Sequence, residues 1–244
     1  MKRIQKGSEL LWLLGTFFVA LGVALCSKAN LGVSMIAAPA FVIYDYVAPL
    51  WSGFSVGMIE YLIQCLLLIL LCLIIRRWNW HFLLAFLVAV IYGYVLNFFL
   101  FIFRDITFAA LWQKWVMLLI GDVATAFGVA CYFRTYLPLQ IYELFVSEVS
   151  TQFRYNVHQT KWIFDFSLLF VSIFLAVILF KDNEGFSLIM MTQGSYHNLG
   201  LGTLITTVIN SPIIAIMGKI IDSVCDTTPL FPSVKRILFR KPSL

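Results

Sequence analysis

Long apolar runs separated by short polar interruptions dominate the pattern of this chain. Six runs approach the ~20 residues that a helix needs to cross a bilayer; they cover residues 10–27, 54–75, 82–103, 115–133, 160–180 and 201–221. Two shorter apolar stretches, residues 33–47 and 138–149, each follow a long predicted helix that stops at a basic residue. Non-helical backbone at membrane depth is tolerated only inside protein or beside water, so we predict broken or re-entrant half-helices there.

The composition agrees with this pattern. Hydrophobic residues make up 61% of the 244 residues and charged residues only 12%, against ~45–50% and ~25% in soluble domains. The mean hydropathy is +0.93. These values exclude a soluble globular protein, a disordered chain and a disulfide-rich secreted scaffold. They predict an all-α membrane protein, with about six transmembrane helices, whose main partner is the lipid bilayer.

Basic residues predict the orientation, because short cytoplasmic loops carry an excess of Lys and Arg. They cluster at the N-terminus, at the turn of Arg76 and Arg77, and in residues 222–244. The net charge of the whole chain is +5. Six crossings of one transmembrane domain, residues 1–221, place all three clusters in the cytoplasm and residues 222–244 as a basic tail. Eight crossings would also keep both termini inside, but would put the Arg76–Arg77 turn outside.

An internal repeat relates the two halves, residues 10–103 and 115–221. Residues 14–31 and 120–137 share six identities in eighteen positions at a shift of 106, and Lys28 falls on Arg134. Each half continues with a short apolar piece and then two long helices. Three crossings per half would place the second half upside down. Inverted repeats with discontinuous helices are a recurrent transporter design, with the solute site near the midplane.

Two segments carry a family resemblance. The stretch Gly22-Val-Ala-Leu-Cys-Ser-Lys-Ala-Asn-Leu-Gly-Val-Ser34, and Gly200-Leu-Gly-Thr203 before a helix that contains Pro212, resemble the YczE/YitT-like bacterial integral membrane proteins. This chain departs from their pattern at Met35, where Pro is usual. It departs again at Leu137-Pro138-Leu139, where a Gly-small-Pro step is usual. The resemblance implies a multipass protein of the bacterial cytoplasmic membrane, and it implies no particular activity.

Polar residues at the short segments are the candidates for binding solute. Lys28 and Arg134 are equivalent in the repeat, and each precedes a half-helix whose N-terminal N–H groups would favour an anion. The predicted substrate-binding set is Lys28, Asn30, Ser34, Arg134, Gln140 and Glu143. If both cations reach one cavity, the solute should be anionic. The alternative is that the two side chains extend to the two membrane surfaces, one on each side.

A second set of ionisable residues lies within predicted spans, where a charged group costs a few kcal/mol. Lys161 and Asp165 are four residues apart on one helix face, and Glu60 and Gln64 take the same positions in the first half. The predicted residues for ion or proton coupling are Asp122, Asp165, Lys161 and Glu60. The alternative is a structural polar seam that holds helices together.

Other chemistries find no support in the sequence. The five Cys residues include no CxxC pair, and no HExxH, GxSxG or P-loop motif occurs. We therefore expect no enzyme, no cofactor, no metal site and no nucleic-acid partner. The predicted function is a transporter or permease for a small solute. The alternative is a solute-binding or accessory subunit that needs an energising partner. Spacings such as Ala20-x-x-x-Ala24 would serve internal packing, a homo-oligomer or a partner subunit.

Overall fold

The computed structural model describes residues 4–5, 7–51, 53–76, 78, 80–180 and 194–226. Six long helices occupy the predicted spans: α1 (Ser8–Ala29), α3 (Val56–Ile75), α4 (Trp80–Ile102), α5 (Leu111–Tyr132), α7 (Val157–Phe180) and α9 (Leu201–Val224). The short helices α2 (Ala38–Val47) and α6 (Ile141–Phe153) occupy the two shorter apolar stretches. Strands β1 (Ile4–Gln5) and β2 (Cys225–Asp226) pair in parallel. The predicted all-α class is confirmed, and α9 extends into the segment predicted as the tail.

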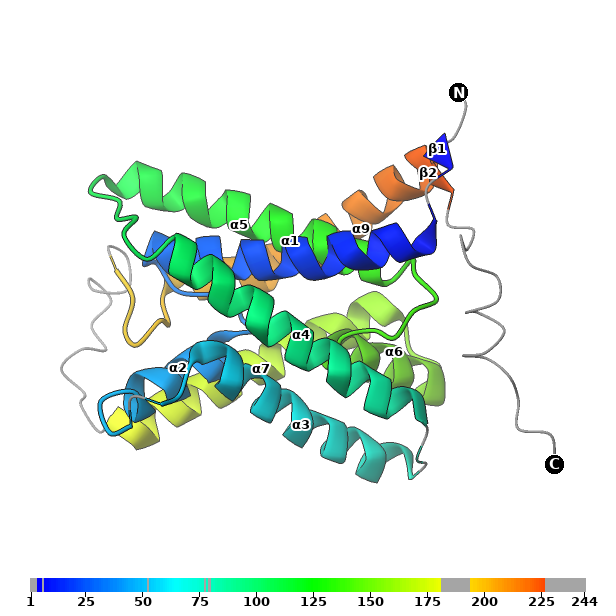
Figure 1. Cartoon of the computed structure of the whole chain (residues 1–244), viewed down its shortest axis with the longest axis horizontal. Coiled ribbons are helices and arrows are strands. Elements are labelled where there is room, and N and C mark those ends of the chain that lie inside the picture. The colour runs from blue at the N-terminus through cyan, green and yellow to red at the C-terminus, as the bar shows by residue number, and fades with distance from the viewer. Residues whose placement is uncertain are drawn as a thin grey trace.

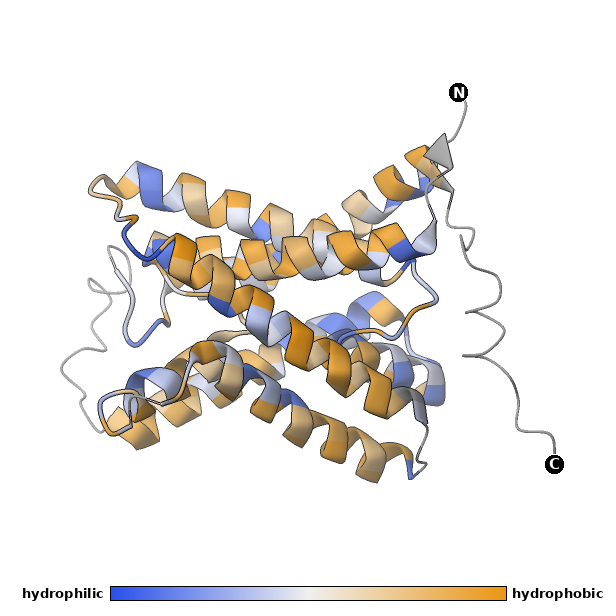
Figure 2. Ribbon diagram, viewed as in Figure 1, coloured by the Kyte–Doolittle hydropathy of each residue, from blue (hydrophilic) through white to orange (hydrophobic). Residues whose placement is uncertain are grey.

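The outer surface of the helices is apolar (Figure 2). Leu66, Phe98 and Phe170 are 67%, 59% and 69% exposed. In the described part of the chain, six helices are long and apolar enough to cross a membrane. Large exposed apolar surfaces of this kind are the faces that lipid covers. The protein is a multipass membrane protein.

The helices run between two ends of the molecule (Figure 1). One end carries β1, β2 and the C-terminal ends of α3, α5 and α9, and we call it the β-pair end. The other, the far end, carries the C-terminal ends of α1, α2, α4 and α7. Of the predicted loops and tail, residues 181–193 and 227–244 lie outside the described residues.

Helix packing follows the repeat. The first helices of the two halves, α1 and α5, form the most extensive contact. Each then packs on the fourth helix of its own half, α1 on α4 and α5 on α9. Each short helix crosses to the other half, α2 packing on α7 and α6 on α3. α3 and α7 even begin alike: the Ser55 side chain accepts from the Met58 N–H and the Asn156 side chain from the His158 N–H, at the predicted shift of 101.

The α1–α5 contact depends on small residues. A Cβ added at Gly121 would lie 2.7 Å from the Cys26 Sγ and 2.8 Å from the Gly22 carbonyl oxygen, so neither backbone leaves room for a side chain. Ala20 and Ala24 are fully buried in the same core. The small-residue spacing on α1 therefore serves internal packing.

The two short helices point in opposite directions. Residues around Met35, just before α2, and Tyr142, in the first turn of α6, belong to one buried cluster. The other end of α2 lies at the far end, where Asp45 accepts a hydrogen bond from Asn198; α6 instead ends toward the β-pair end (Figure 1). The two short helices therefore run in opposite directions, as the predicted inverted topology requires.

Candidate solute cavity and buried charge cluster

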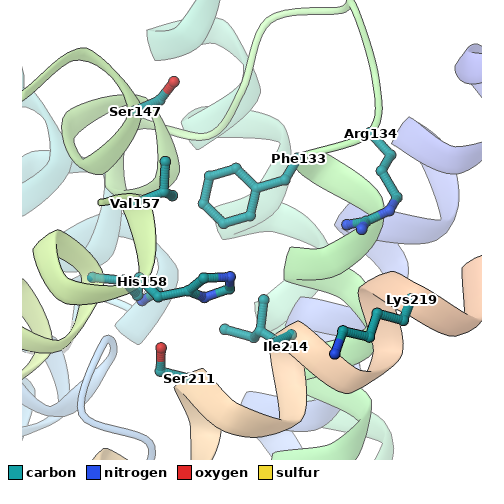
Figure 3. A pocket seen from close by; sticks show the side chains of 10 residues that line it. Phe133, Arg134, Ser147, Val157, His158, Ser211, Ile214 and Lys219 are labelled. Carbon is teal, nitrogen blue, oxygen red and sulfur yellow. The ribbon is translucent and has the colours of Figure 1, made fainter. Parts of the chain in front are cut away.

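A cavity of about 420 Å³ opens at the β-pair end (Figure 3). It lies where α7 begins, between the end of α5, the middle of α6 and the second half of α9. Its lining residues are Phe133, Arg134, Ser147, Val157, His158, Lys161, Ser211, Ile214, Ala215 and Lys219. The volume suits a small molecule.

Basic side chains dominate the charge of this cavity. Arg134, Lys161 and Lys219 line it, and none of its ten lining residues is acidic. Figure 3 shows Arg134 and Lys219 on one side of the cavity and the His158 ring across from them. The hydroxyls of Ser147 and Ser211 add neutral polar groups. Such a lining attracts a negatively charged or carboxylate-bearing ligand.

Arg134 is held in place from outside the cavity. Its Nε and Nη2 donate to the two carboxylate oxygens of Asp222, each at 2.6 Å, in a bidentate pair. Its Nη1 donates to the Ala130 carbonyl oxygen at 3.2 Å. A Cβ at Gly218 would lie 2.5 Å from Nη2, so this glycine leaves the space that the guanidinium occupies. The pair fixes the cation at the mouth of the cavity.

Lys161 is the most deeply buried cation of the cavity. The residue is only 2% exposed, and its Nζ donates to Asp165 Oδ1 at 2.6 Å. Because Lys161 both lines the cavity and pairs with a fully buried Asp165, it connects the cavity with the interior.

Behind Lys161 lies a cluster of buried carboxylates from four helices. Its members are Glu60 of α3, Asp122 of α5, Glu143 of α6 and Asp165 of α7, each at most 1% exposed. Lys161 acts electrostatically on Asp122 and Glu143 as well as Asp165, and Glu143 acts on Glu60. We call these five residues the charge cluster. With four carboxyl groups and one ammonium, full ionisation would leave it strongly negative.

Many polar atoms of this region have no hydrogen-bond partner among the described residues. They include both carboxylate oxygens of Glu60 and of Asp122, and one each of Glu143 and Asp165. Both amide atoms of the buried residues Gln64 and Gln140 are in the same condition. Buried polar groups are almost always satisfied, so each of these atoms calls for a proton, a water molecule or a ligand.

The ends of the two broken segments meet beside the cluster. Met35 and Ile36 pack with Tyr142, Phe164 and Leu168. The amide nitrogen of Asn210, midway along α9, lies 3.9 Å from the Met35 sulfur. The N-terminal ends of α2 and α6 therefore converge at mid-depth, which is where discontinuous helices form solute sites.

A second cavity, of about 310 Å³, opens at the far end. It repeats the framework of the first: Lys28 replaces Arg134, Phe41 replaces Ser147 and Val56 replaces Val157. Its Lys28 donates to the Arg104 carbonyl oxygen at 3.2 Å. It also contains an acid, Asp45, whose carboxylate accepts from Asn198 at 2.7 Å. Burial raises the pKa of Asp45, and the Asn198 hydrogen bond and the nearby His197 oppose that rise.

The structure brings only part of the predicted substrate set together. Lys28 and Arg134 lie in separate cavities at opposite ends, so they do not share one site. Asn30 accepts a hydrogen bond from Ser195 at the far end. Ser34 and Gln140 are buried before the two short helices. Glu143 lies with the four predicted coupling residues in the charge cluster.

Sequence reasoning missed several residues of this site. Lys219 lies inside the predicted span 201–221, and a cation in a membrane span is by itself a sign of a functional site. His158, Ser147 and Ser211 carried no such signal, because they meet only when α6, α7 and α9 pack. The predicted roles of all these residues in binding and coupling stay predictions.

Comparison with known families gives one match. A family model covers residues 6–219. The chain belongs to DUF6198, a family of unknown function. No curated protein and no solved structure matches the chain. The matched residues cover nearly the whole helical fold, from the start of α1 to the last turns of α9.

Proposed function

We propose that this protein transports a small anionic solute, one that carries a carboxylate or a phosphate, across the membrane. The observation that carries the proposal is the cavity at the β-pair end, with three basic and no acidic lining residues. Lys161 leads from this cavity to a buried cluster at the meeting point of two broken helices. Positively lined, partly dry clefts concentrate anions and exclude free cations.

The far-end cavity supports transport over simple capture. Two repeat-related cavities approach the buried cluster from opposite ends and are separated from one another by packed helices, which suits a site that alternates between the two sides of the membrane. In the opposite conformation, Lys28 would then take the part that Arg134 takes here. In an inverted repeat, the conformation open to the other side arises when each half adopts the arrangement that the other half has here.

We infer that the protein lies in a bacterial inner membrane with its β-pair end on the cytoplasmic side. Arg76 ends α3 at that end, and α1 begins and α9 ends there. Basic residues precede α1 and follow α9 in the sequence, and an excess of Lys and Arg is typical of cytoplasmic sides. A relation to the YczE/YitT-like proteins would agree with this location. The cavity at the β-pair end is then the cytoplasmic one.

The test is ligand binding and uptake by the purified protein. A thermal-shift screen of small carboxylates and phosphates should find a stabilising compound, because a ligand stabilises the folded state by RT ln(1 + [L]/Kd). Arg134→Gln and Lys219→Gln should weaken that binding. The control is Arg154→Gln, an exposed arginine at the same end that does not line the cavity.

Reconstitution into liposomes separates transport from its alternative. Uptake of the bound anion by the protein alone supports a transporter. Tight binding without uptake would support the accessory-subunit alternative. A screen in which only cations or neutral compounds bind, with the Arg134 and Lys219 variants unaffected, would refute the anion assignment.

A further inference from the structure

Within the charge cluster, Glu60 and Glu143 form a pair distinct from Lys161 and Asp165. Glu60 is fully buried on α3 and Glu143 is 1% exposed in the first turn of α6, and these two helices pack together. The two carboxyl groups act electrostatically on one another. Lys161 acts on Glu143 but makes its hydrogen bond to Asp165. Lys161, the one cation of the charge cluster, therefore forms its ion pair with Asp165 and not with Glu60 or Glu143.

The surroundings of the pair are polar but lack a cation of their own. Glu60 and Glu143 both act electrostatically on Tyr92 and Tyr142, and the Tyr142 hydroxyl lies close enough to Glu60 to interact with its carboxylate. The Tyr92 hydroxyl has no hydrogen-bond partner among the described residues. Gln64 lies one helical turn after Glu60 on the same face, and its amide is also unpartnered. These groups can donate to a carboxylate or accept from a carboxylic acid.

Other titratable groups reach the pair from the neighbouring helices. Tyr132 of α5 and Asp165 of α7 act on Glu143. α2, which also packs on α3, carries its titratable residues Tyr44, Asp45 and Tyr46 in the half that leads to the far end. The pair is therefore influenced by one cation, Lys161, by a neighbouring carboxylate and by tyrosines.

Two carboxylates in such a place cannot both stay ionised. Like charges that share a buried site hold a proton between them, and an isolated buried charge neutralises because desolvation costs too much. Either Glu60 oxygen can take up the added proton, the Gln64 amide oxygen can accept a hydrogen bond from the resulting acid, and the Gln64 amide nitrogen can donate to the remaining carboxyl oxygen.

We propose that Glu60 and Glu143 form a two-carboxylate proton site whose affinity for its proton rises when an anion enters the cavity. This inference rests on the proposed function. An anion beside Lys161 would offset the ammonium charge that holds Glu143 ionised. Proton binding at the pair then becomes more favourable, so anion and proton bind together and move in the same direction. One proton is taken up with no bond made or broken in the solute.

The test needs no solute, so its failure is separate from failure of the proposed function. Infrared spectroscopy of the purified protein detects the carbonyl band of a protonated carboxylic acid. Labelling glutamate with ¹³C shifts that band only if it belongs to a glutamate, which separates the pair from Asp122 and Asp165. We expect a protonated glutamate band at neutral pH that is lost on raising the pH. Glu60→Gln and Glu143→Gln should each abolish the pair's titration, and Glu148→Gln, on the same helix as Glu143 but less buried, should leave it intact.

Lys161→Gln tests the link to the cavity. Removing the ammonium should keep the glutamate band up to a higher pH, by about one pH unit or more, since one unit corresponds to ~1.4 kcal/mol of interaction. If a variant fails to fold, the isotope-labelled titration of the wild-type protein still decides the matter. Absence of a protonated glutamate band at neutral pH would overturn the proposal. So would loss of the band on adding sodium chloride at constant pH, which would mean that a metal cation occupies the site.

Discussion

The two end cavities are built from equivalent parts of the repeat, yet they differ in charge. The β-pair cavity has three basic and no acidic lining residues, and the far-end cavity has one of each, Lys28 and Asp45. Their cations are also held differently, Arg134 by the carboxylate of Asp222 and Lys28 by a backbone carbonyl. The common framework is what two-sided access requires. The difference shows that the two halves have diverged in the charge of their cavities.

The largest expected effect tests whether the two cavities open on opposite sides of the membrane. In a cysteine-free background, Lys219→Cys and Lys28→Cys should react with impermeant thiol reagents added to opposite faces of the membrane. The sidedness should be essentially complete, because each residue lies at one end of the molecule. Leu50→Cys, in the turn after α2, and Thr151→Cys, in the last turn of α6, serve as matched reporters of the same two faces. Labelling of both from one face would contradict the inverted topology.

The next largest effect is expected at Lys161, which forms a buried ion pair with Asp165. The equivalent position in the first half holds an acid, Glu60, that has no ion-pair partner among the described residues. Lys161→Met should lower the free energy of unfolding by about 3–5 kcal/mol at neutral pH, because it leaves the buried Asp165 without its cation. Chemical unfolding in detergent measures this change. Glu60→Gln, at the equivalent position, should have a smaller effect, since Glu60 has no such ion-pair partner to leave uncompensated and the amide matches a protonated carboxyl group in shape. Equal effects at the two positions would show that the charge cluster is symmetric after all.

Arg134 and Lys28 sharpen the comparison at the level of binding. Arg134→Gln should weaken binding of the anion found by screening by about 1.5–3 kcal/mol, the value of a charge-assisted contact. Lys28→Gln should weaken it less in this conformation, and the double variant should resemble Arg134→Gln alone. Isothermal titration calorimetry gives all three numbers. Unchanged binding in both single variants, with normal membrane insertion, would leave the anion assignment without support.

The smallest effect is expected at Asp45. Its raised pKa, caused first by burial, means that the folded state binds its proton more tightly than the unfolded state does. Its contribution to stability is therefore greatest in acid and declines as the pH rises through the folded-state pKa. Asp45→Asn should thus gain stability over the wild type as the pH is raised from 4 to 7, as measured by thermal unfolding. Asp105→Asn, an exposed residue in another far-end loop, is the control.

Local sequence was enough for the helices, because a span needs only a long apolar run. The predicted segments 54–75 and 201–221 became α3 and α9 with ends displaced by at most three residues. The shift of 101 between Val56 and Val157 was also readable, since it joins the first residues of two equivalent helices. The site was less predictable. The repeat linked Glu60 with Lys161, but Asp122 and Glu143 were chosen for being polar in apolar segments, and nothing in the spacing placed all four residues together.

What the sequence by itself determined is the membrane location, the six spans, the two broken segments and the inverted repeat. All of these depend on hydrophobicity and on similarity between segments of one chain. Only the tertiary structure decided that Lys28 and Arg134 lie at opposite ends, and that Lys219 and His158 join Arg134 in one cavity. The physical reason is that a short helix may pack in its own half or cross to the other. Here α2 crosses to α7 and α6 to α3, which brings Glu60 beside Glu143 from positions 83 residues apart.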